Sequence, residues 1–177
     1  MLNNDFEAIY LEYSDKVYSY IFLLVKNKEL AEDLTQETFY KAYRKIHSFK
    51  EEASIYTWLI KIGRNLTYDF YRRRRVLSFF SIEKYNDKRV SNDTPQEIII
   101  KGERVQILYE AIKKLKLEYQ EVIILRKIKD FSIKEVSIIL GWSEVKVKNT
   151  TSRAIVSLRK ILSEKGEDFD ANFIEIG

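Results

Sequence analysis

FSIKEVSIILGWSEVKVKNTTSRAIVSLRKIL, residues 131–162, has the pattern of two helices joined by a sharp corner. Ser132 followed three residues later by Glu135 is a capping box, in which the two side chains satisfy backbone N–H groups at the start of a helix. Gly141 can adopt the left-handed conformation that ends this helix, and Ser143 can cap the next helix two residues later. So short a connection makes the two helices cross steeply, which predicts a helix-turn-helix.

The second of these helices has a narrow apolar stripe and a polar, basic face on the opposite side. At about 100° per residue, the stripe that is predicted to face a core consists of Val147, Thr151, Ala154 and Leu158. The opposite face consists of Asn149, Ser152 and Arg153, flanked by Lys146 and Lys148. Side chains of these types hydrogen-bond base edges in a major groove or pair with phosphates. The alternative is an ordinary amphipathic helix with a solvated basic face, because two-helix corners are common.

The composition favours an almost entirely helical protein. The 177 residues include one proline and five glycines, and 33% of them are charged, whereas sheets and long loops need more turn residues. A hydrophobic content of 45% is enough for one or two cores. The positive charge is concentrated in residues 97–165, which hold 15 Lys and Arg against 9 Asp and Glu. An all-α fold is therefore predicted, with its basic part around the helix-turn-helix, as in modules that bind polyanions.

Residue types that commonly carry catalysis or bind metals are scarce. Cysteine is absent, which excludes disulfides and thiolate metal sites, and His47 is the only histidine. The sequence has no glycine-rich phosphate loop, so an enzyme is disfavoured, and we expect no catalytic residue, metal or cofactor. The N-terminus has no basic and then apolar leader, and the apolar runs are far shorter than a membrane span. We therefore expect a cytoplasmic protein.

The first part of the chain predicts two helices. Apolar residues spaced by three and four predict a core helix over residues 6–25 and a second helix from near Glu29 to Ile46. Three polar residues of the second helix share one exposed side and form a candidate docking face: Asp33, Gln36 and Glu37. The alternative role of its charges is to stabilise the helix, since its start is acidic and its end is basic.

Aromatic and basic residues are interleaved in YTWLIKIGRNLTYDFYRRRR, residues 56–75. Aromatic rings accept unstacked bases and guanidinium groups hold phosphates, so this mixture suits single-stranded nucleic acid. The alternative is a core role for the apolar residues and simple solvation of the helix end by the arginines. We predict phosphate contact for residues 72–75 and a core role for Trp58, Leu59, Ile62 and Leu66.

The remaining segments predict two small helical domains joined by a flexible linker. Residues 76–96 lose helical periodicity and contain the only proline, so the first domain is assigned to residues 1–75 and the linker to residues 76–99. Residues 100–165 form the second domain, in which two further helices precede the helix-turn-helix. Residues 166–177 form an acidic tail that begins with a glycine, and we expect this tail to be mobile.

Three segments in this order resemble the extracytoplasmic function (ECF) group of bacterial sigma factors, which belong to the sigma-70 family. They are AEDLTQETFYKAY (31–43), YTWLIKIGRNLTYDFYRRRR (56–75) and LYEAIKKLKLEYQEVIILRKIKDFSIKEVSIILGWSEVKVKNTTSRAIVSLRK (108–160). The resemblance covers roughly residues 5–163, and the two blocks together are more specific than either block alone. It implies two helical domains, sigma region 2 and sigma region 4. Together these bind core RNA polymerase and direct promoter recognition, strand opening and transcription initiation, often of stress or envelope-response genes.

The resemblance also implies a role for each candidate site. It places Asp33, Gln36 and Glu37 against the clamp helices of the largest polymerase subunit. The loop over residues 48–54 would form a pocket for a flipped base of the melted minus-ten element. Contacts with that element and its phosphates would come from Tyr56, Trp58, Lys61, Arg64, Asn65, Tyr68 and Arg72. The minus-thirty-five element would be read by Lys146, Lys148, Asn149, Ser152 and Arg153.

The sequence departs from the group at a few of these positions. Many members have Gly-Thr where this chain has Val145 and Lys146, so the promoter sequence that is read can differ. Acidic Glu51 and Glu52 lie in the loop that would receive DNA. The resemblance implies one further partner, an anti-sigma factor that hides these faces until a signal releases them. The alternative function is a stand-alone helix-turn-helix regulator, which needs neither the docking face nor the aromatic and arginine block.

Overall fold

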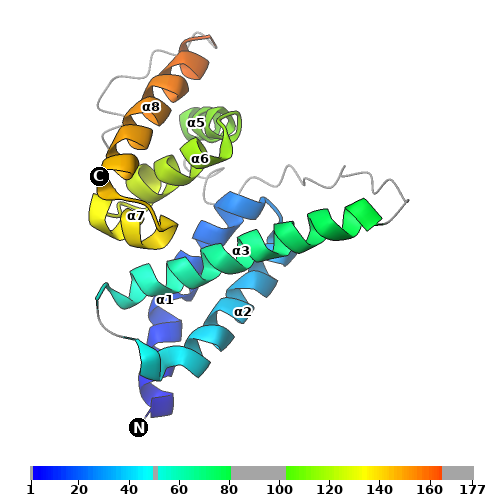
Figure 1. The fold of residues 1–177 in the computed structure, drawn as a ribbon, viewed down its shortest axis with the longest axis vertical. Helices are drawn as coiled ribbons and strands as arrows, with labels where there is room; N and C mark the ends of the chain where they lie inside the picture. The colour runs from blue at the N-terminus through cyan, green and yellow to red at the C-terminus, as the bar shows by residue number, and fades with distance from the viewer. Residues whose placement is uncertain (1, 50–51, 81–102, 165–177) are drawn as a thin grey trace. The chain divides into compact units, whose positions relative to one another are not determined.

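The computed structural model describes residues 2–49, 52–80 and 103–164. The chain divides into two compact units, Met1–Asp93 and Thr94–Gly177 (Figure 1). All regular secondary structure in the described residues is helical, so the predicted all-α fold is confirmed. Most of the expected linker and nearly all of the segment that follows the last helix lie outside the described residues.

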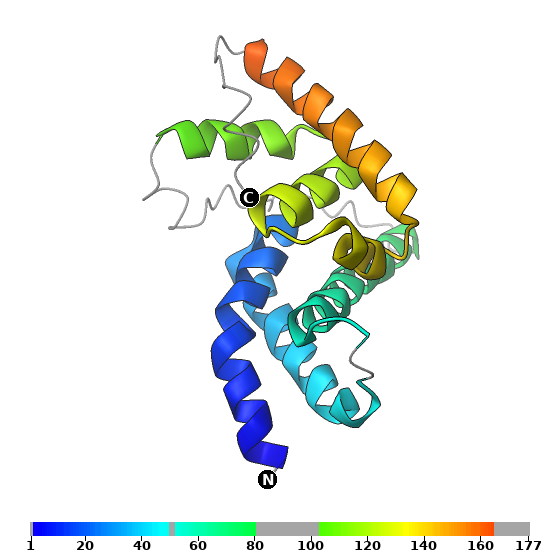
Figure 2. The same ribbon diagram turned by 90° about the vertical axis from the view of Figure 1, so that its left-hand side faces the viewer.

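In the described residues, the first unit is a bundle of three α-helices. Its elements are α1 (Leu2–Val25), α2 (Lys28–Lys45), the short 3-10 helix η1 (Ile46–Ser48) and α3 (Ile55–Phe80). α1 and α2 lie side by side and α3 crosses both (Figures 1 and 2), so that each helix contacts the other two. Their shared core includes Val17, Tyr20, Ile21, Ala31, Leu34, Phe39, Leu59, Ile60 and Leu66.

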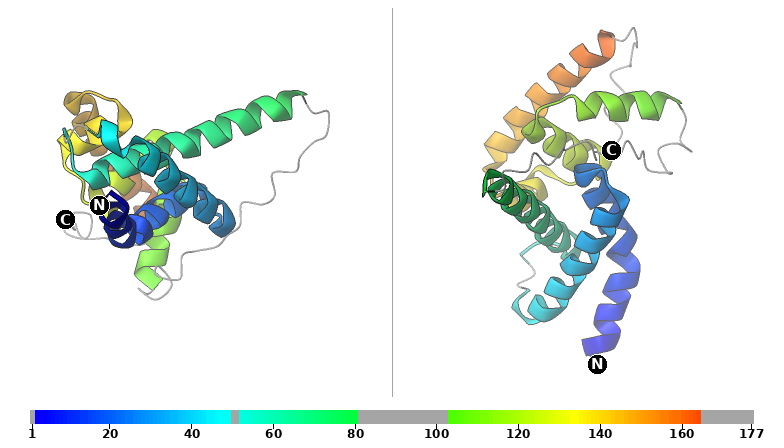
Figure 3. Two further views of the ribbon diagram at one scale, coloured as in Figure 1. Left: turned by 90° about the horizontal axis from the view of Figure 1, so that it is seen from below. Right: turned by 90° about the vertical axis from the view of Figure 1, so that its right-hand side faces the viewer.

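Two features of this unit differ from the prediction. Trp58 and Ile62, which are predicted to belong to the core, are only partly buried, whereas Leu59 and Leu66 are buried as predicted. α3 ends at Phe80 and therefore includes residues 76–80, which the sequence pattern assigns to the linker. The C-terminal half of α3 projects beyond α1 and α2 (Figure 3). Backbone hydrogen bonds form a helix without a regular apolar spacing, so the end of that spacing does not mark the end of the helix.

Gly63 lies where α3 meets the other two helices. A β carbon at this position would be 3.1 Å from Ile21 Cδ1 and 3.2 Å from Thr38 Oγ1. The Thr38 hydroxyl cannot easily move away, because it donates a hydrogen bond to the carbonyl oxygen of Leu34 at 2.6 Å. The three helices can therefore approach this closely only because glycine has no side chain.

Replacing Gly63 by leucine should lower the free energy of unfolding by about 1–3 kcal/mol, because overpacking forces neighbouring side chains out of their preferred rotamers. Urea unfolding followed by circular dichroism measures this change. Lys61→Leu is the matched control, since Lys61 is exposed on the same helix and should tolerate the substitution. Equal losses from the two substitutions would contradict the close approach at Gly63.

The second unit is built around α8. Its elements are α5 (Glu103–Lys113), α6 (Leu117–Ile123), the π-helical turn η2 (Ile124–Ile128), α7 (Ile133–Leu140) and α8 (Glu144–Ser163). α8 contacts α5, α6 and α7. The predicted apolar stripe of α8 is confirmed, because Val147, Thr151, Ala154 and Leu158 are all buried. Thr150 and Leu162 widen this stripe, since they are buried as well.

The corner between α7 and α8 has the predicted helix-turn-helix geometry (Figure 2). Ser132 Oγ accepts a hydrogen bond from the backbone N–H of Glu135 at 3.2 Å, and the Glu135 carboxylate accepts one from the backbone N–H of Ser132 at 2.9 Å. Gly141 ends α7 in the left-handed conformation, with φ 68° and ψ 32°. Ser143 Oγ then caps α8 by accepting a hydrogen bond from the backbone N–H of Lys146 at 3.2 Å.

Replacing Gly141 by alanine should lower the free energy of unfolding of the second unit by about 1–2 kcal/mol, the cost of placing a β carbon in the left-handed region. No neighbouring atom lies within 4 Å of that β carbon, so the loss comes from backbone strain alone. Gly141→Asn should cost less, because asparagine tolerates this conformation. Thermal unfolding of both variants tests the difference, and equal stability of the alanine variant and the wild type would contradict the strain.

Candidate nucleic-acid and protein interfaces

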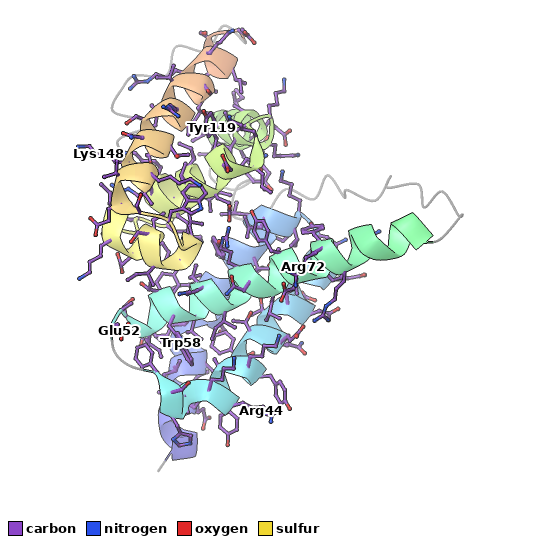
Figure 4. All side chains as sticks on the ribbon, viewed as in Figure 1. Arg44, Glu52, Trp58, Arg72, Tyr119 and Lys148 are labelled. Carbon is purple, nitrogen blue, oxygen red and sulfur yellow. The ribbon has the colours of Figure 1, made fainter. Side chains whose placement is uncertain are left out.

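The outer face of α8 carries the five residues that the sequence predicts to contact duplex DNA. The buried stripe on the opposite side fixes the rotation of α8, so Lys146, Lys148, Asn149, Ser152 and Arg153 are all exposed. Figure 4 shows the Lys148 side chain on the side of α8 that is remote from α5 and α6. No acidic residue occurs between Val145 and Ser163, so this face is positively charged. The structure therefore brings these five residues together on one surface.

A groove of about 400 Å³ lies along one side of this face. Lys146, Asn149 and Arg153 line it from α8. The other wall comes from the start of α6 and the residue before it, and consists of Lys116, Glu118 and Tyr119. Tyr119 is labelled in Figure 4. Sequence reasoning missed these three residues, because they lie 25 to 28 positions before Glu144, the first residue of α8, and no local pattern connects them to it.

The face of α3 combines exposed polar residues with partly buried aromatic residues. At about 100° per residue, Lys61, Asn65, Tyr68 and Arg72 lie within about 60° of one another around the helix. Lys61, Asn65 and Arg72 are exposed and Tyr68 is partly buried. Seven residues are predicted to contact the minus-ten element and its phosphates, and these four of them share one side of α3.

Side chains on and beside this face contact one another. The Arg64 guanidinium lies 4.4 Å from the centre of the Tyr68 ring, which is a cation–π contact. Arg72 Nη2 forms an ion pair with Asp69 Oδ1 at 2.9 Å. Because this pair lies at the surface, it stabilises the fold little, and Arg72 can exchange Asp69 for a phosphate.

The structure does not bring Tyr56 together with the rest of the α3 face. The Tyr56 ring stacks on the Tyr13 ring of α1, with centroids 5.6 Å apart and ring planes 16° apart. Lys16 Nζ of α1 lies 5.0 Å from the centre of the Tyr13 ring on the same cluster. Burial raises the pKa of Tyr56 to about 12, because the charged phenolate would lose its hydration. Tyr56 thus joins α1 to the start of α3.

The loop before α3 is closed by an aromatic pair. Phe49 packs against Trp58 with ring centroids 5.2 Å apart. Ser54 Oγ caps α3 by accepting a hydrogen bond from the backbone N–H of Thr57 at 3.1 Å. Glu52 is exposed in this loop (Figure 4), whereas Glu51 lies outside the described residues.

The candidate docking face on α2 is exposed as predicted. Asp33, Gln36 and Glu37 all point to solvent, because Ala31, Leu34, Thr35, Thr38, Phe39 and Ala42 are buried on the other side of the helix. Glu37 Oε1 forms an ion pair with Lys41 Nζ at 3.2 Å. Both partners of this pair are substantially exposed, so it contributes little to stability and leaves Glu37 available to a partner.

The described residues offer neither a metal site nor a membrane span. His47 is the middle residue of η1 and is exposed. Within the ranges 2–49, 52–80 and 103–164, no group of three or more His, Cys, Asp or Glu side chains could hold a metal ion. No helix in the described part of the chain is long and apolar enough to span a bilayer.

Both units resemble known protein families and known structures. Residues 9–76 match Sigma-70 region 2, and residues 105–158 match Sigma-70, region 4. The chain is 34% identical over 164 residues to the ECF RNA polymerase sigma factor SigX of Bacillus subtilis, an alignment that covers 90% of this chain and 84% of SigX. It is 33% identical over 163 residues to RNA polymerase sigma factor YlaC of the same organism, with 92% of this chain and 94% of YlaC covered.

The structural comparison agrees with these matches. The sigma factor RpoE from Bartonella quintana, solved in complex with the anti-sigma factor NepR, gives a TM-score of 0.71 at 26% identity, with 90% of this chain and 97% of RpoE covered. CnrH, solved with the cytosolic domain of CnrY, has a similar fold, with a TM-score of 0.67 at 21% identity. The α2 and α3 faces fall within the region 2 match, and the α8 face falls within the region 4 match.

Proposed function

Because the chain belongs to the ECF group of the sigma-70 family, and is therefore an RNA polymerase sigma factor and not an enzyme, we propose a role in initiation for each of its three exposed faces. The α2 face docks on core polymerase, the α3 face holds the melted minus-ten element, and the α8 face reads the minus-thirty-five element. One observation carries this proposal: a single chain presents an acidic face, a basic and aromatic face and a basic recognition face, each on the exposed side of a different helix.

The second unit, Thr94–Gly177 (unit 2), reads duplex DNA through the major groove. The N-terminal half of α8 enters the groove, as the second helix of a helix-turn-helix does. Arg153 and Asn149 are suited to paired hydrogen bonds with guanine and adenine, whereas Lys146 and Lys148 are suited to phosphates. Val145 projects from the start of the same helix with 69% of its surface exposed, and it can contact a thymine methyl group.

The first unit, Met1–Asp93 (unit 1), stabilises the opened strand. Lys61 and Arg72 lie at opposite ends of the shared α3 face and bind phosphates, while Asn65 between them can hydrogen-bond a base edge. The Tyr68 ring with the Arg64 guanidinium over it forms a flat, cationic platform for an unstacked base. We assign Tyr56 to packing, since its ring already stacks on Tyr13.

Unit 1 also carries the polymerase contact. Asp33, Gln36 and Glu37 present two carboxylates and one amide on a helix that the unit's core holds in place. Such a face suits a basic, rigid partner, and the clamp helices of the largest polymerase subunit are the partner that the family implies. We place this interaction in the bacterial cytoplasm.

We also propose that an anti-sigma factor regulates the activity of this chain. RpoE from Bartonella quintana was solved in complex with an anti-sigma factor, and this chain has a similar fold over most of its length. We propose that a partner of that class covers the exposed faces of this chain and releases them in response to stress or envelope signals.

Run-off transcription with core polymerase, this chain and a genomic promoter library tests the proposal. The expected result is a limited set of transcripts that share sequence elements near minus ten and minus thirty-five. A chain that neither binds core polymerase nor directs a specific transcript would contradict it. Sequence-specific DNA binding without any binding to core polymerase would instead identify a stand-alone helix-turn-helix regulator.

A further inference from the structure

Trp142 lies in the corner between α7 and α8, at the edge of the recognition face. Its backbone N–H donates to the carbonyl oxygen of Ser137 at 3.1 Å, which closes the turn around Gly141. The residue is partly buried, so part of its surface remains accessible. Trp142 is one of only two tryptophans in the chain, and the other, Trp58, belongs to unit 1.

The side chain of Lys146 lies over the indole ring of Trp142 in a cation–π contact. Lys146 Nζ lies 3.8 Å from the centre of the ring, closer than the 4.4 Å contacts of Lys116 with Tyr119 and of Arg64 with Tyr68. Tryptophan is the aromatic residue that attracts a cation most strongly. A lysine side chain is otherwise flexible and loses considerable rotamer freedom when it binds. The ring therefore restricts the ammonium group before any ligand arrives.

Lys146 is also one of the residues that line the groove beside α8. Lys116 and Arg153 line the same groove, so three cations surround it. Among the described residues that line the groove, Glu118 is the one carboxylate, so these residues together carry a net positive charge. An ammonium group has three N–H donors, so contact with the ring leaves donors for an anion. A backbone phosphate of duplex DNA is the ligand that this arrangement suits.

We infer that Trp142 is a positioning residue for promoter binding: its indole holds the Lys146 ammonium at the groove beside α8, where it meets a backbone phosphate of the minus-thirty-five duplex. The inference rests on the proposed reading of that element by α8. It assigns Trp142 a role that neither the helical phase of α8 nor its basic composition indicates, because Trp142 precedes the helix.

A double-mutant cycle in the holoenzyme tests this role. The probe is a duplex chosen by the run-off experiment, and its affinity is measured for the wild type, Trp142→Leu, Lys146→Met and the double variant. Trp142→Leu should weaken binding by about threefold, the order expected for a partly exposed cation–π contact. Trp142→Phe should recover part of the loss. In the Lys146→Met background, Trp142→Leu should cause no further loss.

Lys160→Met supplies the matched control, because Lys160 is exposed at the far end of α8. In that background Trp142→Leu should keep its threefold effect. Independent losses from Trp142→Leu and Lys146→Met would overturn the inference, since a merely structural tryptophan would act whether or not the lysine is present. Thermal unfolding of each variant identifies any loss that arises from misfolding.

A measurement without DNA separates this inference from the proposed function. In a Trp58→Phe chain, the fluorescence reports Trp142 alone, and Lys146→Met should change the emission whereas Lys160→Met should not. Unchanged emission with Lys146→Met would overturn the contact itself. A wild-type holoenzyme that selects no duplex would overturn the proposed function, even if the fluorescence result shows that the contact exists.

Discussion

Replacing Asp33 and Glu37 together by alanine should weaken binding to core RNA polymerase by at least about tenfold while unit 1 stays folded. Both side chains are exposed on α2, and the ion pair of Glu37 with Lys41 at the surface contributes little to stability. Charges that lie within an interface steer association and fix the orientation of the partners, so their loss is felt mainly in the complex. Competition for core polymerase against a labelled wild-type chain measures the affinity.

The matched control removes the same charge from another helix of the same unit. Glu7 and Asp15 are exposed on α1, so Glu7→Ala with Asp15→Ala changes the net charge equally but leaves α2 intact. This control should bind core polymerase as the wild type does, and both double variants should unfold at nearly the wild-type temperature. Equal weakening by the two double variants would mean that net charge, and not the α2 face, determines the affinity.

The faces that could be predicted from the sequence are those that a single helix defines. The phase of α8 places Val147 and Ala154 in the core and Lys148 and Arg153 in solvent, because the 3.6-residue period relates all positions along one helix. The corner at Gly141 is equally local, since caps and left-handed residues act within one turn. The fold class and the recognition face therefore follow from neighbouring residues.

Contacts between distant segments could not be predicted in this way. The stacking of Tyr56 on Tyr13 joins α3 to α1, and the groove brings Lys116 and Tyr119 beside α8. Periodicity states which side of a helix is buried, but not which other helix covers it. The same limit applies to the end of α3, because the loss of a regular apolar spacing does not state where a helix ends, and α3 continues to Phe80.

Arg153→Ala should weaken promoter binding by the holoenzyme by about 1–3 kcal/mol, and the loss should depend on the base at one position of the minus-thirty-five element. Arg153 is exposed on α8 and lines the groove with Asn149, while Ala154 beside it is buried and fixes its direction. Arginine makes two parallel hydrogen bonds to guanine, so its removal should relax specificity at that base pair.

Binding of a set of duplexes with single-base changes measures this effect. Arg159→Ala is the matched control, since Arg159 is exposed on the same helix but lies about 120° around it from Arg153, towards its C-terminal end. The control should leave the order of preference among the duplexes unchanged. If Arg153→Ala lowers the affinity for every duplex equally and lowers the salt dependence by about one phosphate contact, Arg153 binds the backbone, and base reading by α8 falls to Asn149 and its other neighbours.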